Sequence, residues 1–105
     1  MTLLDRLKQI LAPDVIFPDG SRIKPLHRMA LRYFEDEKTL DIGYEPISCW
    51  FSYELIVSSL KNWNPPYDSV EINQDMKRAI IEKVLLYGRK RGHKVKIRND
   101  VFDNK

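Results

Sequence analysis

The sequence predicts an α+β fold, in which an antiparallel β-meander carries a long C-terminal helix on one face. Two observations lead to this class. Residues 14–57 alternate between polar turns and short segments rich in aromatic and β-branched residues, which is typical of strands. A broad apolar stripe with helical spacing then follows Asn73. With 105 residues, the chain has the length of a single domain.

The N-terminal part of the chain, residues 1–13, predicts a short helix. Its leucines and isoleucine recur at helical spacing, and Pro13 ends the pattern. Residues 14–57 predict the meander, with one turn at Pro18-Asp19-Gly20 and a hairpin whose polar turn spans residues 35–38. The segment CWFSYELIVSS predicts a buried strand at the end of the meander.

Residues 58–72 predict a rigid connector, because Pro65 and Pro66 lack the backbone N–H that helices and central strands require. Trp63 stands at the entrance of this connector and has two interpretations. Its ring is either buried against the sheet and the helix, or it forms part of an exposed recognition corner.

Residues 73–98 predict a helix followed by a strand. Asn73 is a good N-cap and Gly92 a good C′ residue, and the alternating segment up to Arg98 is expected to form the last strand. Because a helix precedes it, this strand is free to pair with a strand other than its immediate predecessor. Residues 99–105 are expected to form a loose tail.

The net charge of +3 hides an uneven distribution. Residues 77–98 contain nine basic residues and one acid, a net charge of +8, whereas residues 35–75 contain nine acids and two lysines, a net charge of −7. This asymmetry either steers a charged partner or reflects two solvated halves of one domain that attract each other.

The residue pattern argues against catalysis and against a cofactor. His27, His93 and the lone Cys49 do not form a metal-ligand pattern, and the four glycines do not form a phosphate-binding loop. We therefore expect no enzyme activity, no metal and no cofactor. The lone cysteine fits a reducing compartment, and the N-terminal segment lacks a signal-peptide pattern, so a cytoplasmic location without membrane insertion is expected.

Nucleic-acid binding is one functional interpretation of the C-terminal half. A phosphate backbone is recognised by basic patches, and such residues are dense around the predicted helix end. The same residues also suit a helix C-terminus and an edge strand, and no aromatic stacking platform accompanies them. The candidate nucleic-acid-binding residues are Arg89, Lys90, Arg91, Lys94 and Lys96.

Protein binding is the interpretation that the acidic region favours, since interfaces combine aromatic anchors with surrounding charges. The candidate partner-binding residues belong to the hairpin turn and the connector: Glu35, Asp36, Glu37, Asp41, Trp63, Asn64, Tyr67 and Asp68.

Residues 30–98 resemble a small family of immunity proteins from bacterial polymorphic toxin systems. The resemblance rests on a hairpin that ends in Gly-x-Glu and on a strand followed by Ser-x-x-x-Trp-x-Pro-Pro, a helix and a last strand. The matching positions are Gly43, Glu45, Ser59, Trp63, Pro65, Pro66, Gly92 and Val95. The family often has Asp where this chain has Asn64, and the N-terminal helix lies outside the resemblance.

This resemblance implies a bacterial, cytoplasmic antidote without catalysis of its own. Its partner would be the toxic C-terminal domain of a cognate effector, whose active site or substrate path it would block.

Overall fold

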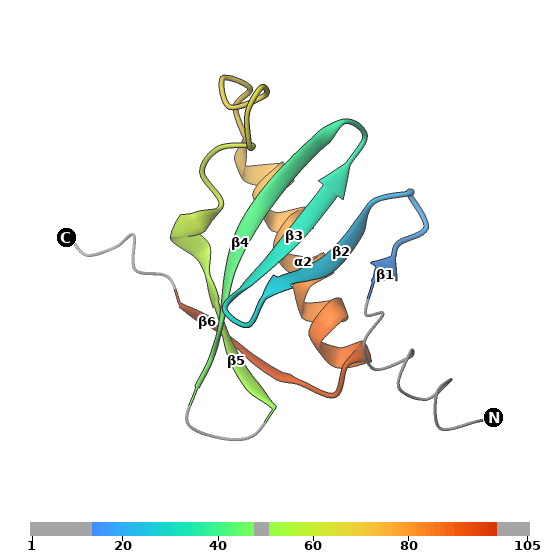
Figure 1. The fold of residues 1–105 in the computed structure, drawn as a ribbon, viewed down its shortest axis with the longest axis vertical. Helices are drawn as coiled ribbons and strands as arrows, with labels where there is room; N and C mark the ends of the chain where they lie inside the picture. The colour runs from blue at the N-terminus through green and yellow to red at the C-terminus, as the bar shows by residue number, and fades with distance from the viewer. Residues whose placement is uncertain (1–13, 48–50, 99–105) are drawn as a thin grey trace.

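The computed structural model describes residues 14–47 and 51–98, which build a six-stranded sheet and one long helix (Figure 1). The helix lies on one face of the sheet, so the structure fits the predicted α+β class. The helix expected over residues 1–13 and the tail expected over residues 99–105 lie outside the described residues. In chain order the elements are β1 (Val15–Ile16), β2 (Arg22–His27), β3 (Ala30–Glu35), β4 (Lys38–Pro46), β5 (Ser52–Ile56), the 3-10 turn η1 (Val57–Ser59), α2 (Gln74–Lys90) and β6 (Lys94–Arg98).

The order of the strands in the sheet follows their order in the chain. Strands β1 to β5 each run antiparallel to the next, whereas β6 runs parallel to β5, with Tyr53 opposite Val95. The sheet is therefore mostly antiparallel. The last strand lies next to its predecessor in the chain, because the connector and α2 bring the chain back to the starting end of β5, as a parallel pair requires.

The β3–β4 hairpin has a tighter turn than the sequence predicts. Asp36 and Glu37 alone form the turn, and Glu35 faces Lys38 as the last strand pair. Along both strands, alternate residues such as Tyr33 and Leu40 are buried beneath the helix. The residues between them face away from the helix.

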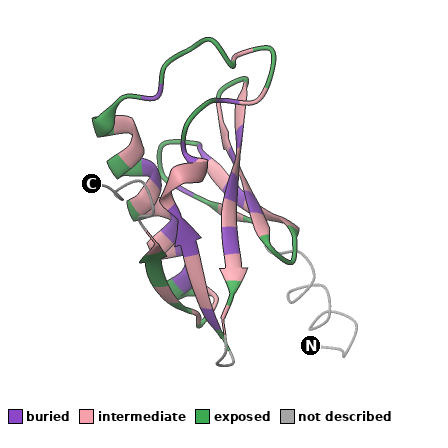
Figure 2. Cartoon of the chain, turned by 90° about the vertical axis from the view of Figure 1, so that its left-hand side faces the viewer, coloured by how far each residue is buried: buried purple, intermediate pink, exposed green. Residues whose placement is uncertain are grey.

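Helix α2 begins and ends where its sequence predicts. The Asn73 side chain accepts a hydrogen bond from the backbone N–H of Met76, and Gly92 adopts a φ of +75° just after the helix. Its buried side chains, Ile80, Val84 and Tyr87, follow one stripe toward the sheet. Figure 2 shows buried segments on both the strands and the helix.

The connector covers a part of β4 that has no neighbouring strand. Strand β5 pairs only with residues 43–46 of β4, which leaves the first half of β4 open on that side. There the backbone N–H of Asn64 donates to the carbonyl oxygen of Thr39 over 2.8 Å. Trp63 inserts its ring beneath this contact and is 1% exposed. Of its two interpretations, the buried one agrees with the structure.

Candidate functional site

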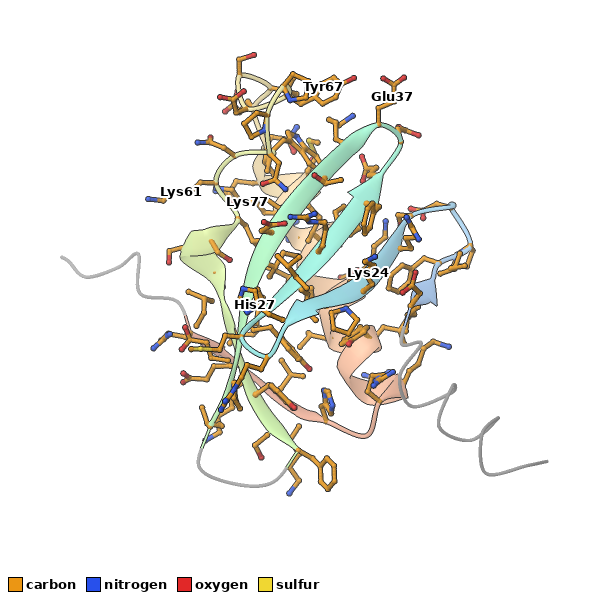
Figure 3. The ribbon with its side chains drawn as sticks, viewed as in Figure 1. Lys24, His27, Glu37, Lys61, Tyr67 and Lys77 are labelled. Carbon is orange, nitrogen blue, oxygen red and sulfur yellow. The ribbon has the colours of Figure 1, made fainter. Side chains whose placement is uncertain are left out.

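The candidate surface is formed by the β3–β4 turn and the connector, which lie at the same end of the molecule (Figure 1). Figure 3 labels Glu37 and Tyr67 at this end, one from each segment. We call this surface the acidic tip and define it by Glu35, Asp36, Glu37, Tyr67 and Asp68. The fold therefore brings together turn residues and connector residues that are about thirty positions apart in the sequence.

Two carboxylates of the acidic tip are held by tyrosine hydroxyls. The Tyr67 hydroxyl donates to Glu37 Oε1 over 2.7 Å, and the Tyr33 hydroxyl donates to Glu35 Oε1 over 2.6 Å. The carboxylate of Glu37 raises the pKa of Tyr67, because the neutral hydroxyl is the form that donates. These bonds fix the directions of Glu35 and Glu37 while leaving their charges in place.

The other two carboxylates, those of Asp36 and Asp68, are exposed and form no ion pair within residues 14–47 and 51–98. Asp36 has a φ of +55°, a left-handed conformation that Asp adopts more readily than most residues. The tip thus exposes negative charge on both of its segments.

Beneath the acidic tip lie the other three residues that were predicted to bind a partner: Asp41, Asn64 and Trp63. Arg32 donates to both carboxylate oxygens of Asp41, over 2.7 and 3.1 Å, and Asn64 Nδ2 donates to the same carboxylate over 3.1 Å. The bond from Arg32 lowers the pKa of Asp41. Asp41 and Asn64 therefore join the connector to the hairpin, and Trp63 is buried below them.

A groove of about 430 Å³ adjoins the tip and adds a residue that the sequence did not single out for binding. It is lined by the β1–β2 turn, including Asp19, and by Glu35 and Asp36. The Lys83 ammonium donates to Asp19 over 2.6 Å and lowers the pKa of this carboxyl. Asp19 was recognised only as a turn residue, because its distance from the hairpin turn in the sequence conceals their proximity.

The basic residues of the alternative interpretation are divided between two parts of the fold. Arg89 and Lys90 are exposed at the end of α2. Lys94 and Lys96 are exposed on β6, and because Val95 packs against the core, they point to the sheet face away from the helix. Arg91 is half-buried at the helix end. This division does not support a single nucleic-acid-binding surface.

Neither a metal site nor a membrane span is found in the part of the chain that the structure describes. It contains no group of three or more metal-ligating side chains. Its helix is too short and too polar to cross a bilayer.

Exposed turns that a packed scaffold holds in place often carry the binding residues of a protein. The family model described as Immunity protein 74 matches residues 28–98, and the chain belongs to this family. The resemblance to immunity proteins is thereby confirmed. The match includes the entire acidic tip but not Asp19. No curated protein and no solved structure matches the chain.

Proposed function

We propose that this immunity protein neutralises a cognate bacterial toxin by docking its acidic tip over the active site of the toxic domain. It acts in the bacterial cytoplasm as a single folded domain and catalyses no reaction. The observation that carries the proposal is the group of four carboxylates at the tip, of which Asp36, Glu37 and Asp68 are exposed and Glu35 is half-buried, within the region that the family model matches.

The chemistry of the tip favours a basic partner surface. A toxin that cleaves nucleic acid has a groove lined by Lys and Arg, and carboxylates can occupy the positions of phosphate groups in such a groove. Opposite charges also accelerate the encounter of the two proteins and suppress association with wrong partners.

The hydrogen bonds of the tip favour tight docking. Glu35 and Glu37 are already oriented by tyrosine hydroxyls, at 2.6 and 2.7 Å. Side chains that are ordered before binding lose less conformational entropy in the complex. The connector is likewise fixed to β4 through Asn64 and Asp41, so the two segments of the tip form one rigid surface.

The test begins with a tagged pull-down from the native lysate, which identifies the toxin. Association with its purified toxic domain is then measured at low and high salt for the wild type and for the Glu35→Gln/Asp36→Asn/Glu37→Gln variant. We expect the variant to associate about tenfold more slowly at low salt and to lose most of the salt dependence.

The matched control is Glu82→Gln, which removes one exposed acid from helix α2 outside the tip. It should change the association rate by less than about twofold. Circular dichroism shows whether each variant remains folded. An unchanged rate for the folded triple variant would contradict docking through the acidic tip.

A further inference from the structure

The last strand of the sheet, β6, has an open edge. It ends the strand order of the sheet, so among the described residues no strand lies on its other side. The backbone N–H of Lys94 donates to the carbonyl oxygen of Phe51, just before β5, over 2.7 Å. Because the backbone groups of successive residues point to opposite sides of a strand, those of Val95 and Ile97 point away from β5. The edge therefore offers two N–H and two C=O groups to an added strand.

A groove of about 300 Å³ borders this edge on the helix side of the sheet. Residues from the first half of α2, from β6 and from the turn η1 line it, and its apolar side chains are Val57, Ile81 and Ile97. Val57 and Ile81 are half-buried, and Ile97 is 48% exposed. A partner can therefore contact these side chains without any movement of the core. Apolar pockets beside an open strand edge are what an added strand uses for its alternate side chains.

The unpaired charges around the edge are basic. Lys94 and Lys96 are exposed on the sheet face away from the helix, and neither forms an ion pair with another described residue. Lys77 lines the groove and likewise has no ion pair within the described part of the chain. No carboxylate is found among the described residues that line the groove.

The acids nearest in the sheet are already paired. Arg98, at the end of β6, lies 3.1 Å from a carboxylate oxygen of Glu45 and 3.6 Å from one of Glu54. These two carboxylates therefore compensate Arg98, and the lysines of β6 are left as the charges that a partner meets. A partner with carboxylates is the electrostatic complement of this edge.

The same charges argue against a second copy of the chain at this edge. Two β6 strands related by a twofold axis would run antiparallel, and alternation would place the basic residues of one copy opposite those of the other. Like charges directly opposite each other destabilise a strand pair, whereas opposite charges stabilise it.

We propose that the β6 edge and its groove bind an extended segment of another protein in which acidic and apolar residues alternate. The backbone of this segment pairs with Val95 and Ile97, and its carboxylates face Lys94 and Lys96. An apolar side chain of the segment enters the groove beside Ile97. Main-chain hydrogen bonds supply affinity in this mode of binding, and the alternate side chains supply specificity. The site is separate from the acidic tip and does not depend on docking there.

A capped hexapeptide of alternating glutamate and valine serves as the probe. It is titrated into the isotope-labelled full chain while backbone amide signals are recorded by NMR. The same peptide with glutamine in place of glutamate tests the charge, and a fully N-methylated version tests the backbone pairing. We expect saturable shifts of the Val95 and Ile97 amide signals, with affinities at least about tenfold weaker for the two control peptides.

Two pairs of lysine substitutions locate the binding charge. Lys94→Gln/Lys96→Gln should weaken binding of the glutamate peptide about tenfold. The matched control, Lys24→Gln/Lys61→Gln, removes two lysines outside both the edge and the groove (Figure 3) and should change binding less than about twofold. Circular dichroism shows whether each variant remains folded.

Four results would overturn the proposal. The first is the absence of saturable shifts at β6, and the second is a control peptide that binds as well as the glutamate peptide. The third is equal weakening by the two pairs of lysine substitutions. The fourth is a dimer of the protein alone, in sedimentation experiments, that Ile97→Lys converts to a monomer, because a second copy would then occupy the edge.

Discussion

The acidic tip and the junction of helix α2 with the sheet, which we define by Tyr44, Tyr53, Tyr87, Gly88 and His93, are built by different interactions. At the tip, carboxylates stand on two exposed turns, and neutral tyrosine hydroxyls orient two of them. At the junction, Tyr44 and Tyr53 stack at 4.7 Å between ring centroids, and the Tyr44 hydroxyl lies 2.9 Å from His93 Nδ1. The comparison teaches that hydrogen bonds orient exposed charge at the tip, whereas ring packing joins the helix to the sheet at the junction.

The two regions also differ in what supports them. Trp63 lies under the tip and stacks on Tyr33 with 6.3 Å between ring centroids, so the tip depends on the burial of one large side chain. The junction depends instead on close approach of the helix to the sheet at Gly88. The variants below test each support separately.

Removing the Trp63 side chain, which supports the tip, should have the largest effect on the free energy of unfolding. Trp63→Ala should destabilise the fold by about 3–5 kcal/mol, because a fully buried indole leaves a large cavity. Urea denaturation followed by circular dichroism measures the free energy of unfolding.

Trp63→Phe is the matched control for this change. It keeps an aromatic ring and removes an indole N–H that is buried without a hydrogen-bond partner among the described residues. We expect it to cost no more than about 2 kcal/mol. If Trp63→Ala is as stable as the wild type, the indole does not support the tip.

Adding a side chain at Gly88 should have an intermediate effect on the free energy of unfolding. A Cβ atom at Gly88 would collide with Val95 Cγ2 and lie 3.0 Å from the Tyr44 hydroxyl. Gly88→Ala should therefore destabilise the fold by about 1–3 kcal/mol, although helix propensity alone would favour alanine by about 1 kcal/mol. Thermal unfolding measures the result.

Ala79→Gly, at an exposed position of the same helix, reports the propensity effect without any collision and should cost about 1 kcal/mol. The histidine NMR signals should also move in Gly88→Ala, because Tyr44 contacts His93. A gain in stability for Gly88→Ala would show that the helix and sheet are not in close contact there.

The smallest effect on the free energy of unfolding is expected at Asp41, which links the connector to the hairpin. Asp41→Asn should cost less than about 1 kcal/mol at neutral pH, since the Arg32–Asp41 pair is partly exposed. The pair lowers the pKa of Asp41 below its value of 3.8 in the unfolded chain, so its contribution is complete above that pH and is lost as the pH falls through the folded-state pKa.

Melting temperatures of the wild type and of Asp41→Asn, compared across pH, test this sign. The difference between the two should shrink as the pH falls below about 4. A difference that is constant with pH would mean that ionisation of Asp41 does not stabilise the connector.

Local patterns in the sequence were sufficient for several parts of the structure. The Asn73 cap and the apolar stripe of α2 act within a few residues of each other, and each is found where its pattern predicts. The last strand also forms where its alternation predicts, but Ile97, which the alternation assigns to the same face as Val95, is 48% exposed. The family relationship was equally accessible from the order of these motifs. The single-domain organisation and the partner-binding roles of the tip residues stay predictions.

Such local patterns could not predict which strands pair when they are far apart in the sequence. The parallel match of β6 with β5 depends on the path of the connector and α2, and no local signal in β6 encodes its neighbour. The division of the basic residues between the helix end and the outer sheet face follows from that pairing.

The sequence by itself determined that strands are followed by helix α2 and a last strand, where helix α2 begins and ends, and that acidic and basic residues are concentrated in different segments, because propensity, capping and periodicity are properties of neighbouring residues. Only the tertiary structure decided that Asp41 and Asn64 are structural links, that Asp19 joins the hairpin turn in one groove, and that two histidines and two arginines share a pocket. These relations join residues far apart in the chain, and packing of the whole core is what brings them together.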